Sequence, residues 1–265
     1  MRRAAFFDVD RTLIPGSSLF LLARGLYERD FFRVRDLIKF GWGQLKFVAV
    51  GERAEDVDAT RDSALAFVKG RYRDELRAWG REIAEERVLP RVYEDIARVI
   101  ESHRNSGDET YLVTAAPVEL ASFLADSLQM TGALGTESEM DDQGRYTGRL
   151  SGEILHGPAK AKAVELLAME RDIDLSESSA YSDSKNDLPL LELVGNPHAV
   201  NPESELRRIA RMRGWPVHEL RTKRRALLIG VPSAVGGIAI FLAGMAAGAA
   251  VVKKRIEAGR RRWRR

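Results

Sequence analysis

The sequence contains no cysteine among its 265 residues. This absence excludes disulfide bonds and thiolate metal sites, and it is compatible with a reducing compartment. The chain also has no internal repeat. Its first residues do not have the pattern of a signal peptide, because Asp8 and Asp10 interrupt the apolar stretch too early. With 45% apolar residues, the chain is long enough to bury one main core and a small cap.

Acidic residues are scarce at the C-terminal end. Residues 221–265 contain 12 Lys and Arg but a single acid, Glu257, so they carry a net charge of +11. Residues 1–220 carry a net charge of −8. The modest overall charge of +3 therefore hides a strong asymmetry, and the basic character belongs to the C-terminal end.

An uncharged run of 27 residues, 226–252, lies within this basic end. A helix of that length would cross a hydrocarbon core about 30 Å thick. We therefore predict a single-pass transmembrane helix over 226–252, and a membrane location with the catalytic part in the cytoplasm. A re-entrant or protein-buried helix is the alternative, because Pro232 and the many Gly and Ala weaken the pattern.

The basic tail, residues 253–265, ends in six residues of which five are arginine. A tail of this kind can hold anionic lipid headgroups beside a membrane, or it can simply be solvated. We expect no nucleic acid partner.

Two carboxylates sit two residues apart near the N-terminus, at Asp8 and Asp10. Residues 4–9 predict a short buried strand, and alternate residues of a strand point the same way, so these two side chains should share one site. Two such anions repel unless a cation lies beside them. Mg²⁺ prefers oxygen ligands and would remove the conflict. Asp8 could then stay ionised as a nucleophile while Asp10 exchanges protons.

Further polar residues follow apolar or turn segments downstream. They are Thr114 with Ala115, Lys160 after the Gly157-Pro158 break, and Asp183, Asn186 and Asp187. Lys162 competes with Lys160 for the same role, and the position directly after the break favours Lys160. Asp183 and Asp187 are four residues apart and would share a helix face if the helix has started by then, and a cation would explain the pairing of like charges there.

This set of residues suits phosphoryl transfer. The transferring group spreads negative charge over its oxygens, so catalysis needs fixed positive charge and directed hydrogen bonds. Lys160 and Mg²⁺ would supply the charge. The hydroxyl of Thr114 and the backbone N–H groups after Asp8 would supply the hydrogen bonds.

The order of these motifs resembles the haloacid dehalogenase superfamily of phosphohydrolases, in its phosphoserine-phosphatase-like branch, over about residues 4–215. The resemblance implies that Asp8 is the phosphorylated nucleophile and that Asp10 acts as acid and base. It also implies the remaining assignments: Thr114 and Lys160 as phosphate-binding residues, Asp8, Asp10 and Asp183 as metal ligands, and Asp187, Asn186 and Ala115 as supporting residues.

Three positions depart from the family pattern. Arg11 and Ser182 stand where glycine is common, and both are tolerable there if the backbone φ is negative. Ser17 stands where phosphoserine phosphatases carry an acid for the substrate ammonium, which argues against phosphoserine itself.

Strands that alternate with helices predict an α/β, Rossmann-like fold, with a mostly parallel sheet, helices on both faces and chemistry at the carboxyl ends of the strands. The expected elements are helices at 117–130, 157–172 and 188–194, strands at 179–182 and 198–200, and a hairpin within 134–150. We assign residues 1–16 and 106–220 to the catalytic core and 17–105 to an inserted helical cap.

Together these observations predict an Mg²⁺-dependent phosphoric monoester hydrolase. The membrane segment and the unusually apolar cap residues 31–48 favour a phospholipid-related monoester, although internal cap packing also explains the latter. A small soluble phosphometabolite of the phosphoserine type is the alternative substrate. A non-catalytic, membrane-tethered binding module is the alternative function.

Overall fold

A computed structural model of the chain describes residues 2–29, 31 and 68–220. The chain forms two units, one of residues 1–25 with 68–225 and one of residues 26–67 with 226–265, and nearly all described residues belong to the first. The strands are β1 (Ala4–Phe7), β2 (Glu109–Pro117), β3 (Gly132–Thr136), β4 (Ser138–Met140), β5 (Tyr146–Leu150), β6 (Ser179–Ser182), β7 (Asn196–Val200) and β8 (Val217–His218). The α-helices are α1 (Ser18–Glu28), α4 (Arg73–Ile83), α5 (Glu94–Asn105), α6 (Val118–Ser127), α7 (Pro158–Arg171), α8 (Leu188–Leu193) and α9 (Ser204–Arg213). Shorter helical turns are η2 (Ala84–Val88), η3 (Leu89–Arg91), η4 (Leu175–Glu177) and η5 (Lys185–Asp187).

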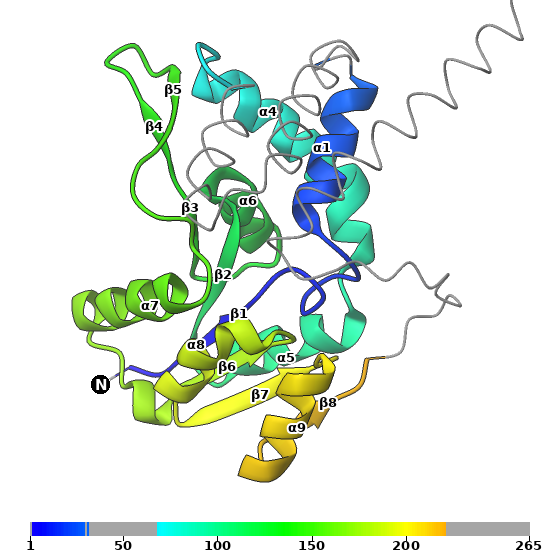
Figure 1. Ribbon diagram of the computed structural model, residues 1–265, viewed down its shortest axis with the longest axis vertical. Coiled ribbons are helices and arrows are strands. Elements are labelled where there is room, and N and C mark those ends of the chain that lie inside the picture. The colour runs from blue at the N-terminus through cyan, green and yellow to red at the C-terminus, as the bar shows by residue number, and fades with distance from the viewer. Residues whose placement is uncertain (1, 30, 32–67, 221–265) are drawn as a thin grey trace, which may run out of the picture. The chain divides into compact units, whose positions relative to one another are not determined.

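The first unit is built on a six-stranded sheet with the order β3-β2-β1-β6-β7-β8 (Figure 1). Its paired strands are all parallel. The chain adds β2 and β3 on one side of β1 and then crosses to add β6, β7 and β8 on the other. Such a reversal of strand order opens a crevice at the carboxyl ends of the central strands, where ligands bind in this class of fold.

Helices cover both faces of this sheet. Ala5 and Phe7 of β1 point into one buried cluster together with residues of α5 and α6. Ala4 and Phe6 point into the opposite cluster with residues of α7, α8 and α9. The alternation follows from the two-residue period of a strand, and both sets are apolar because both faces are buried. The predicted Rossmann-like α/β fold is confirmed.

Most elements expected after residue 105 are also present. Helices α6, α7 and α8 and strands β6 and β7 begin and end within two residues of the expected bounds, except that α6 ends three residues earlier than expected. The predicted hairpin is the antiparallel pair β4 and β5, which turns at residues 141–145. The first residues of the expected hairpin belong instead to β3, which joins the main sheet.

Helix α5 lies within the range that we assigned to the cap, yet it packs on the core. Its Ile96 and Ile100 are buried beside Phe7 and Leu112. Residues four apart lie on one helical face, so this pair covers the sheet as an amphipathic helix does. Helix α5 therefore contributes to the packing around the sheet. Residues 32–67, which form much of the expected cap, lie outside the described residues, and the division into core and cap stays a prediction.

The membrane location is corrected by the helices that the structure describes. Within residues 2–29, 31 and 68–220, no helix combines the length and the apolar character that crossing a bilayer requires. The helix predicted at 226–252 and the basic tail at 253–265 lie outside the described residues. The membrane location is therefore not carried forward.

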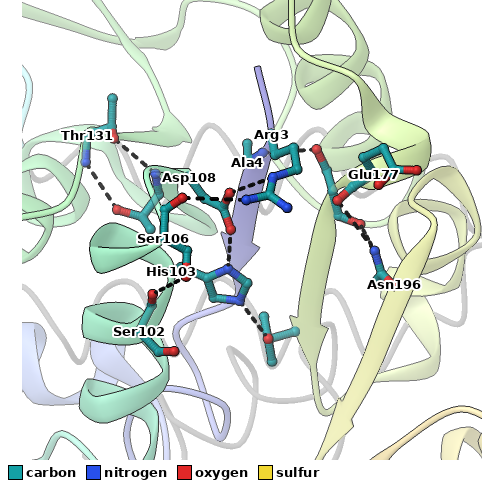
Figure 2. Close-up of polar contacts among 12 residues, drawn as sticks. Arg3, Ala4, Ser102, His103, Ser106, Asp108, Thr131, Glu177 and Asn196 are labelled. Atoms are coloured by element: carbon teal, nitrogen blue, oxygen red, sulfur yellow. Dashed lines mark hydrogen bonds and ion pairs between the residues drawn. The ribbon is translucent and has the colours of Figure 1, made fainter. Parts of the chain in front are cut away.

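Stacked aromatic rings connect the central strands near their carboxyl ends. Tyr181 of β6 stacks on Phe7 of β1 with 4.6 Å between ring centroids, and on His198 of β7 with 4.4 Å. The Tyr181 hydroxyl is 2.8 Å from Nε2 of His103 on α5. Nδ1 of His103 is 2.8 Å from the Asp108 carboxylate, and Figure 2 shows the imidazole facing that carboxylate. These contacts fix the strands that lead into the candidate site.

Candidate active site

Asp8 stands at the carboxyl end of the central strand. Strand β1 ends at Phe7, and the backbone N–H of Asp8 donates to the carbonyl of Tyr181 at 3.0 Å, which continues the pairing with β6 by one residue. The Asp8 residue is only 6% exposed. A carboxylate so deeply buried needs a partner, because removal of a charge from water is costly unless it is paired.

That partner is Lys160 in the first turn of α7. Its Nζ donates to Oδ1 of Asp8 at 2.6 Å and to Oδ2 of Asp187 at 2.8 Å. Lys160 is buried, whereas Lys162 is exposed, so the lysine directly after the Gly157-Pro158 break is the one that reaches the carboxylates. Gly157 has φ of 55°, a conformation that suits glycine, and it starts the helix at this position.

Asp183 and Asp187 follow β6 but do not share a helix face. The turn η5 ends at Asp187, and α8 begins only at Leu188, because the Ser184 side chain accepts from the Asn186 N–H and caps a separate short turn. The condition for one common helix face is therefore not met. Asp187 instead points to Lys160, and it accepts a second hydrogen bond from the Ser182 hydroxyl at 2.8 Å.

Asp183 is buried and lies beside Arg11. Nε of Arg11 is 3.0 Å from Oδ2 of Asp183, close enough for an ion pair, yet this oxygen accepts no well-aligned hydrogen bond. After burial, the negative charge of Asp8 is the next cause that raises the pKa of Asp183, as expected of two carboxylates near each other. Asp183 thus belongs to the same buried group of charges.

The two residues that replace glycine behave differently. Ser182 has a negative φ, which meets the condition for a residue other than glycine, and its hydroxyl donates a hydrogen bond to Asp187. Arg11 has φ of 63°, so the condition of a negative φ is not met at this position. Neither contact was foreseen from the sequence. The available signal was a polar side chain at a glycine position directly beside a candidate acid.

Asp10 lies past the end of the strand rather than within it. Its Oδ1 accepts the backbone N–H of Ser18 at 2.7 Å, so the carboxylate anchors the first turn of α1. Asp10 also raises the pKa of Asp8 by repulsion, which shows that the pair is close. The shared location of the two acids agrees with the sequence-based expectation, although it arises from the loop after β1 and not from strand alternation.

Thr114 and Ala115 lie near the carboxyl end of the neighbouring strand β2. Leu112 pairs with Phe7, so Thr114 extends two residues beyond that level. The Thr114 hydroxyl is buried and accepts the Ala116 N–H at 3.2 Å, and the Ala115 carbonyl accepts from the Thr136 hydroxyl at 2.8 Å.

Burial controls the proton affinity of these acids. Desolvation raises the pKa of Asp8 to about 7, although the attraction of Lys160 opposes the rise. Desolvation and the charge of Asp8 raise the pKa of Asp183 to about 8. Burial alone would lower the pKa of Lys160, but Asp8 and Asp187 outweigh it and raise that pKa above its ordinary value. The site therefore holds more negative charge than its own cations balance.

An Mg²⁺ ion fits this donor set in part. Oδ2 of Asp183 is a buried carboxylate oxygen without a hydrogen bond, and hard oxygen donors are what Mg²⁺ prefers. The described residues contain no group of three or more acidic or histidine side chains arranged around one point. Asp8 and Asp183 are the side chains best suited to hold the ion, since the Asp10 carboxylate is engaged by Ser18.

Comparison with known proteins identifies the family of this chain. A model of the haloacid dehalogenase-like hydrolase family matches residues 5–192, which is more than half of the chain. The chain belongs to this family. The predicted resemblance is confirmed, and the expected class of phosphoric monoester hydrolase agrees with the family and with the names of similar proteins.

Three individual proteins illustrate the similarity to this chain. A phosphoserine phosphatase of Mycobacterium tuberculosis is 47% identical over 233 residues, which covers 88% of this chain and 75% of that protein. A histidinol-phosphatase of Neisseria meningitidis is 31% identical over 82% of this chain and 98% of that protein. A solved structure from Bordetella pertussis, of unknown function, is 31% identical, covers 83% of this chain and all of that chain, and has a TM-score of 0.69.

Proposed function

We propose that the chain is an Mg²⁺-dependent phosphatase of a small phosphorylated metabolite, and that it works through an aspartyl-phosphate at Asp8. The observation that supports this most directly is the buried contact of Lys160 with Asp8 and Asp187 at the carboxyl end of β1. A lysine held there can neutralise the oxygens of a transferring phosphoryl group, as this reaction requires. A non-catalytic binding module would not need a nucleophile and a proton donor side by side.

The proposed reaction has two steps. An Asp8 carboxylate oxygen attacks phosphorus, the bond from phosphorus to the substrate oxygen breaks, and Asp10 gives its proton to the departing oxygen. Asp10 then takes a proton from water, whose oxygen attacks phosphorus, so that the bond to Asp8 breaks and inorganic phosphate leaves. Lys160 and the Thr114 hydroxyl would hold the phosphoryl oxygens in both steps.

Asp8 and Asp183 would hold the metal ion. When bound, Mg²⁺ would supply positive charge that allows an anionic nucleophile to approach an anionic substrate. Asp8 must be ionised to attack, and burial works against this by raising its pKa to about 7. Lys160 keeps the carboxylate ionised by direct contact, and Asp187 keeps Lys160 in place.

The substrate proposal follows the relatives rather than the lipid hypothesis. The phospholipid-related monoester depended on the membrane helix and on cap residues outside the described residues, and it is not carried forward. The two named relatives act on phosphoserine and histidinol phosphate by their names. Both compounds are phosphate esters of a primary alcohol with an amine on the next carbon. We propose that the substrate belongs to this class of 2-aminoalkyl phosphates. Phosphoserine itself is the less favoured member, because Ser17 stands where phosphoserine phosphatases carry an acid for the substrate ammonium.

The test of the reaction uses the full chain and an aryl phosphate. Mg²⁺-dependent release of the phenol should be lost in Asp8→Asn. Asp172→Asn is the matched control, because it also replaces a carboxylate by an amide, and Asp172 is exposed at the end of α7 with φ of 56°, which Asn tolerates. Equal rates for wild type and Asp8→Asn would remove Asp8 as the nucleophile.

The test of the substrate class compares specificity constants. Histidinol phosphate and phosphoserine should be hydrolysed with higher kcat/KM than glycerol 3-phosphate, which has a hydroxyl in place of the amine. If glycerol 3-phosphate is hydrolysed as well as both amines, recognition of the amine is excluded and the phosphatase assignment stands.

A further inference from the structure

Arg11 makes a contact with Asp183 that the proposed reaction does not use. The guanidinium Nε lies 3.0 Å from Oδ2 of Asp183. The Arg11 side chain is 46% exposed, whereas the Asp183 side chain is only 5% exposed. A half-exposed cation therefore contacts the buried carboxylate that is best placed to hold a metal ion.

The backbone at this position does not favour arginine. Arg11 has φ of 63°, a region that side chains other than Gly, Asn and Asp rarely adopt. Its N–H donates to the carbonyl of Gly16 at 3.1 Å, and its carbonyl accepts from Asn201 at 3.5 Å, so the loop holds this conformation. Glycine would fit the same backbone without strain. The guanidinium is thus the feature that an arginine adds here.

The surroundings of Asp183 explain what the guanidinium does. The negative charges of Asp8, Asp187 and Glu203 raise the pKa of Asp183, and the positive charge of Arg11 lowers it. The ion pair lacks a well-aligned hydrogen bond to Oδ2. A contact that is electrostatic, half-exposed and poorly aligned is weak and easily exchanged for another cation.

We propose that the Arg11 guanidinium and a divalent cation compete for the Asp183 carboxylate, so that Arg11 sets the Mg²⁺ affinity of the site. This inference rests on the Mg²⁺ dependence in the proposed function. A positive charge held beside the carboxylate must be moved aside, and it also repels the incoming ion. Loss of that charge should therefore tighten Mg²⁺ binding.

The test measures binding of MgCl₂ to the full-length protein by calorimetry, with the Mg²⁺-dependent rise in Tm as a second measure. Arg11→Gln removes the charge at similar length and on the same backbone, and it should bind Mg²⁺ about fivefold more tightly. Arg11→Lys keeps the charge and should stay within about twofold of wild type. Arg98→Gln removes an exposed arginine that pairs with Asp95 elsewhere on α5, and it should change nothing.

The outcomes separate this inference from the proposed function. If wild type and Arg11→Gln bind Mg²⁺ with equal affinity, the proposed competition is overturned. It is also overturned if Arg11→Lys or Arg98→Gln binds Mg²⁺ as tightly as Arg11→Gln does. Absence of Mg²⁺ binding in all four proteins overturns it as well. If wild type still hydrolyses the aryl phosphate with Mg²⁺ and Asp8→Asn does not, the proposed function survives the first three of these results.

Discussion

Nζ of Lys160 lies 2.6 Å from Oδ1 of Asp8, and both residues are almost fully removed from water. The same ammonium group contacts Asp187, so one buried cation serves two buried anions. Such a cluster is stable only while it is complete, because each charge depends on the others for compensation. The stability of the core and the chemistry of the site are therefore coupled through a single side chain.

Lys160→Met should lose most activity and also destabilise the fold. Removal of one partner from a buried pair costs about 3–5 kcal/mol, because the remaining charges are left unpaired. Urea unfolding measures the loss. Lys162→Met is the matched control, since Lys162 lies two residues away on the same helix and is exposed. Adding Asp187→Asn to Lys160→Met should recover part of the stability, and no recovery would contradict the coupling.

Asp10→Asn should separate the two chemical steps. An aryl phosphate has a good leaving group that needs little protonation, so phosphorylation of Asp8 should continue, whereas activation of water should fail. Rapid mixing with p-nitrophenyl phosphate should show a burst of about one equivalent of phenol and then turnover slowed by roughly 10²–10⁴-fold. A slow reaction with no burst would mean that Asp10 acts in the first step even for this substrate.

His198 should make the fold sensitive to mild acid. Burial, then repulsion from His218 and His103, lowers the pKa of His198 to about 4. Between pH 6.5 and about 4, His198 is protonated in the unfolded chain but stays neutral in the folded chain. The free energy of unfolding therefore falls as the pH falls through that window. With allowance for partial exposure, the contribution is roughly 1–2 kcal/mol.

His198→Phe keeps a ring for stacking on Tyr181 but cannot take up a proton. The free energy of unfolding of this variant should fall less than that of wild type between pH 6.5 and 4. Carboxylates elsewhere titrate equally in both proteins, so the difference reports on His198. Parallel curves for the two proteins would exclude it as an acid-sensitive group.

Substitution of two glycines by alanine should change the stability of the fold in opposite directions. A Cβ on Gly195 would overlap the backbone carbonyl of Ser176, which cannot move freely, so Gly195→Ala should destabilise the fold by roughly 3 kcal/mol. Gly80 lies within α4, and a Cβ there would meet no atom within 4 Å. Gly80→Ala should stabilise by about 0.5–1 kcal/mol. Thermal unfolding of both variants checks the pair of signs.

The sequence allowed prediction of the sheet and of the main charged residues for a clear physical reason. Buried parallel strands appear as short apolar runs, and the residue that follows each run must lie at the carboxyl edge of the sheet. Asp8 and Asp183 were located in this way. Lys160 was preferred because a Gly-Pro break starts a helix beside it, and the structure brings it to Asp8.

Other features depend on contacts that no local pattern encodes. The stack of Phe7, Tyr181 and His198 requires the register of three strands, and the sequence alone does not fix that register. Helix α5 was assigned to the cap because its helical spacing resembles that of the residues before it. Only the burial of Ile96 and Ile100 against the sheet identifies it as part of the core.

The strand order has a consequence for synthesis on the ribosome. Strand β1 emerges before the other strands of the sheet, yet its two neighbours are β2 and β6, and β6 ends only at Ser182. The apolar residues of β1 must therefore wait for most of the chain before both edges are covered. Strand partners that are so distant in sequence slow the folding, and the unpaired strand edges stay exposed and prone to aggregation until the partners arrive. A nascent chain of this protein should depend on chaperones until the second half of the sheet has left the exit tunnel.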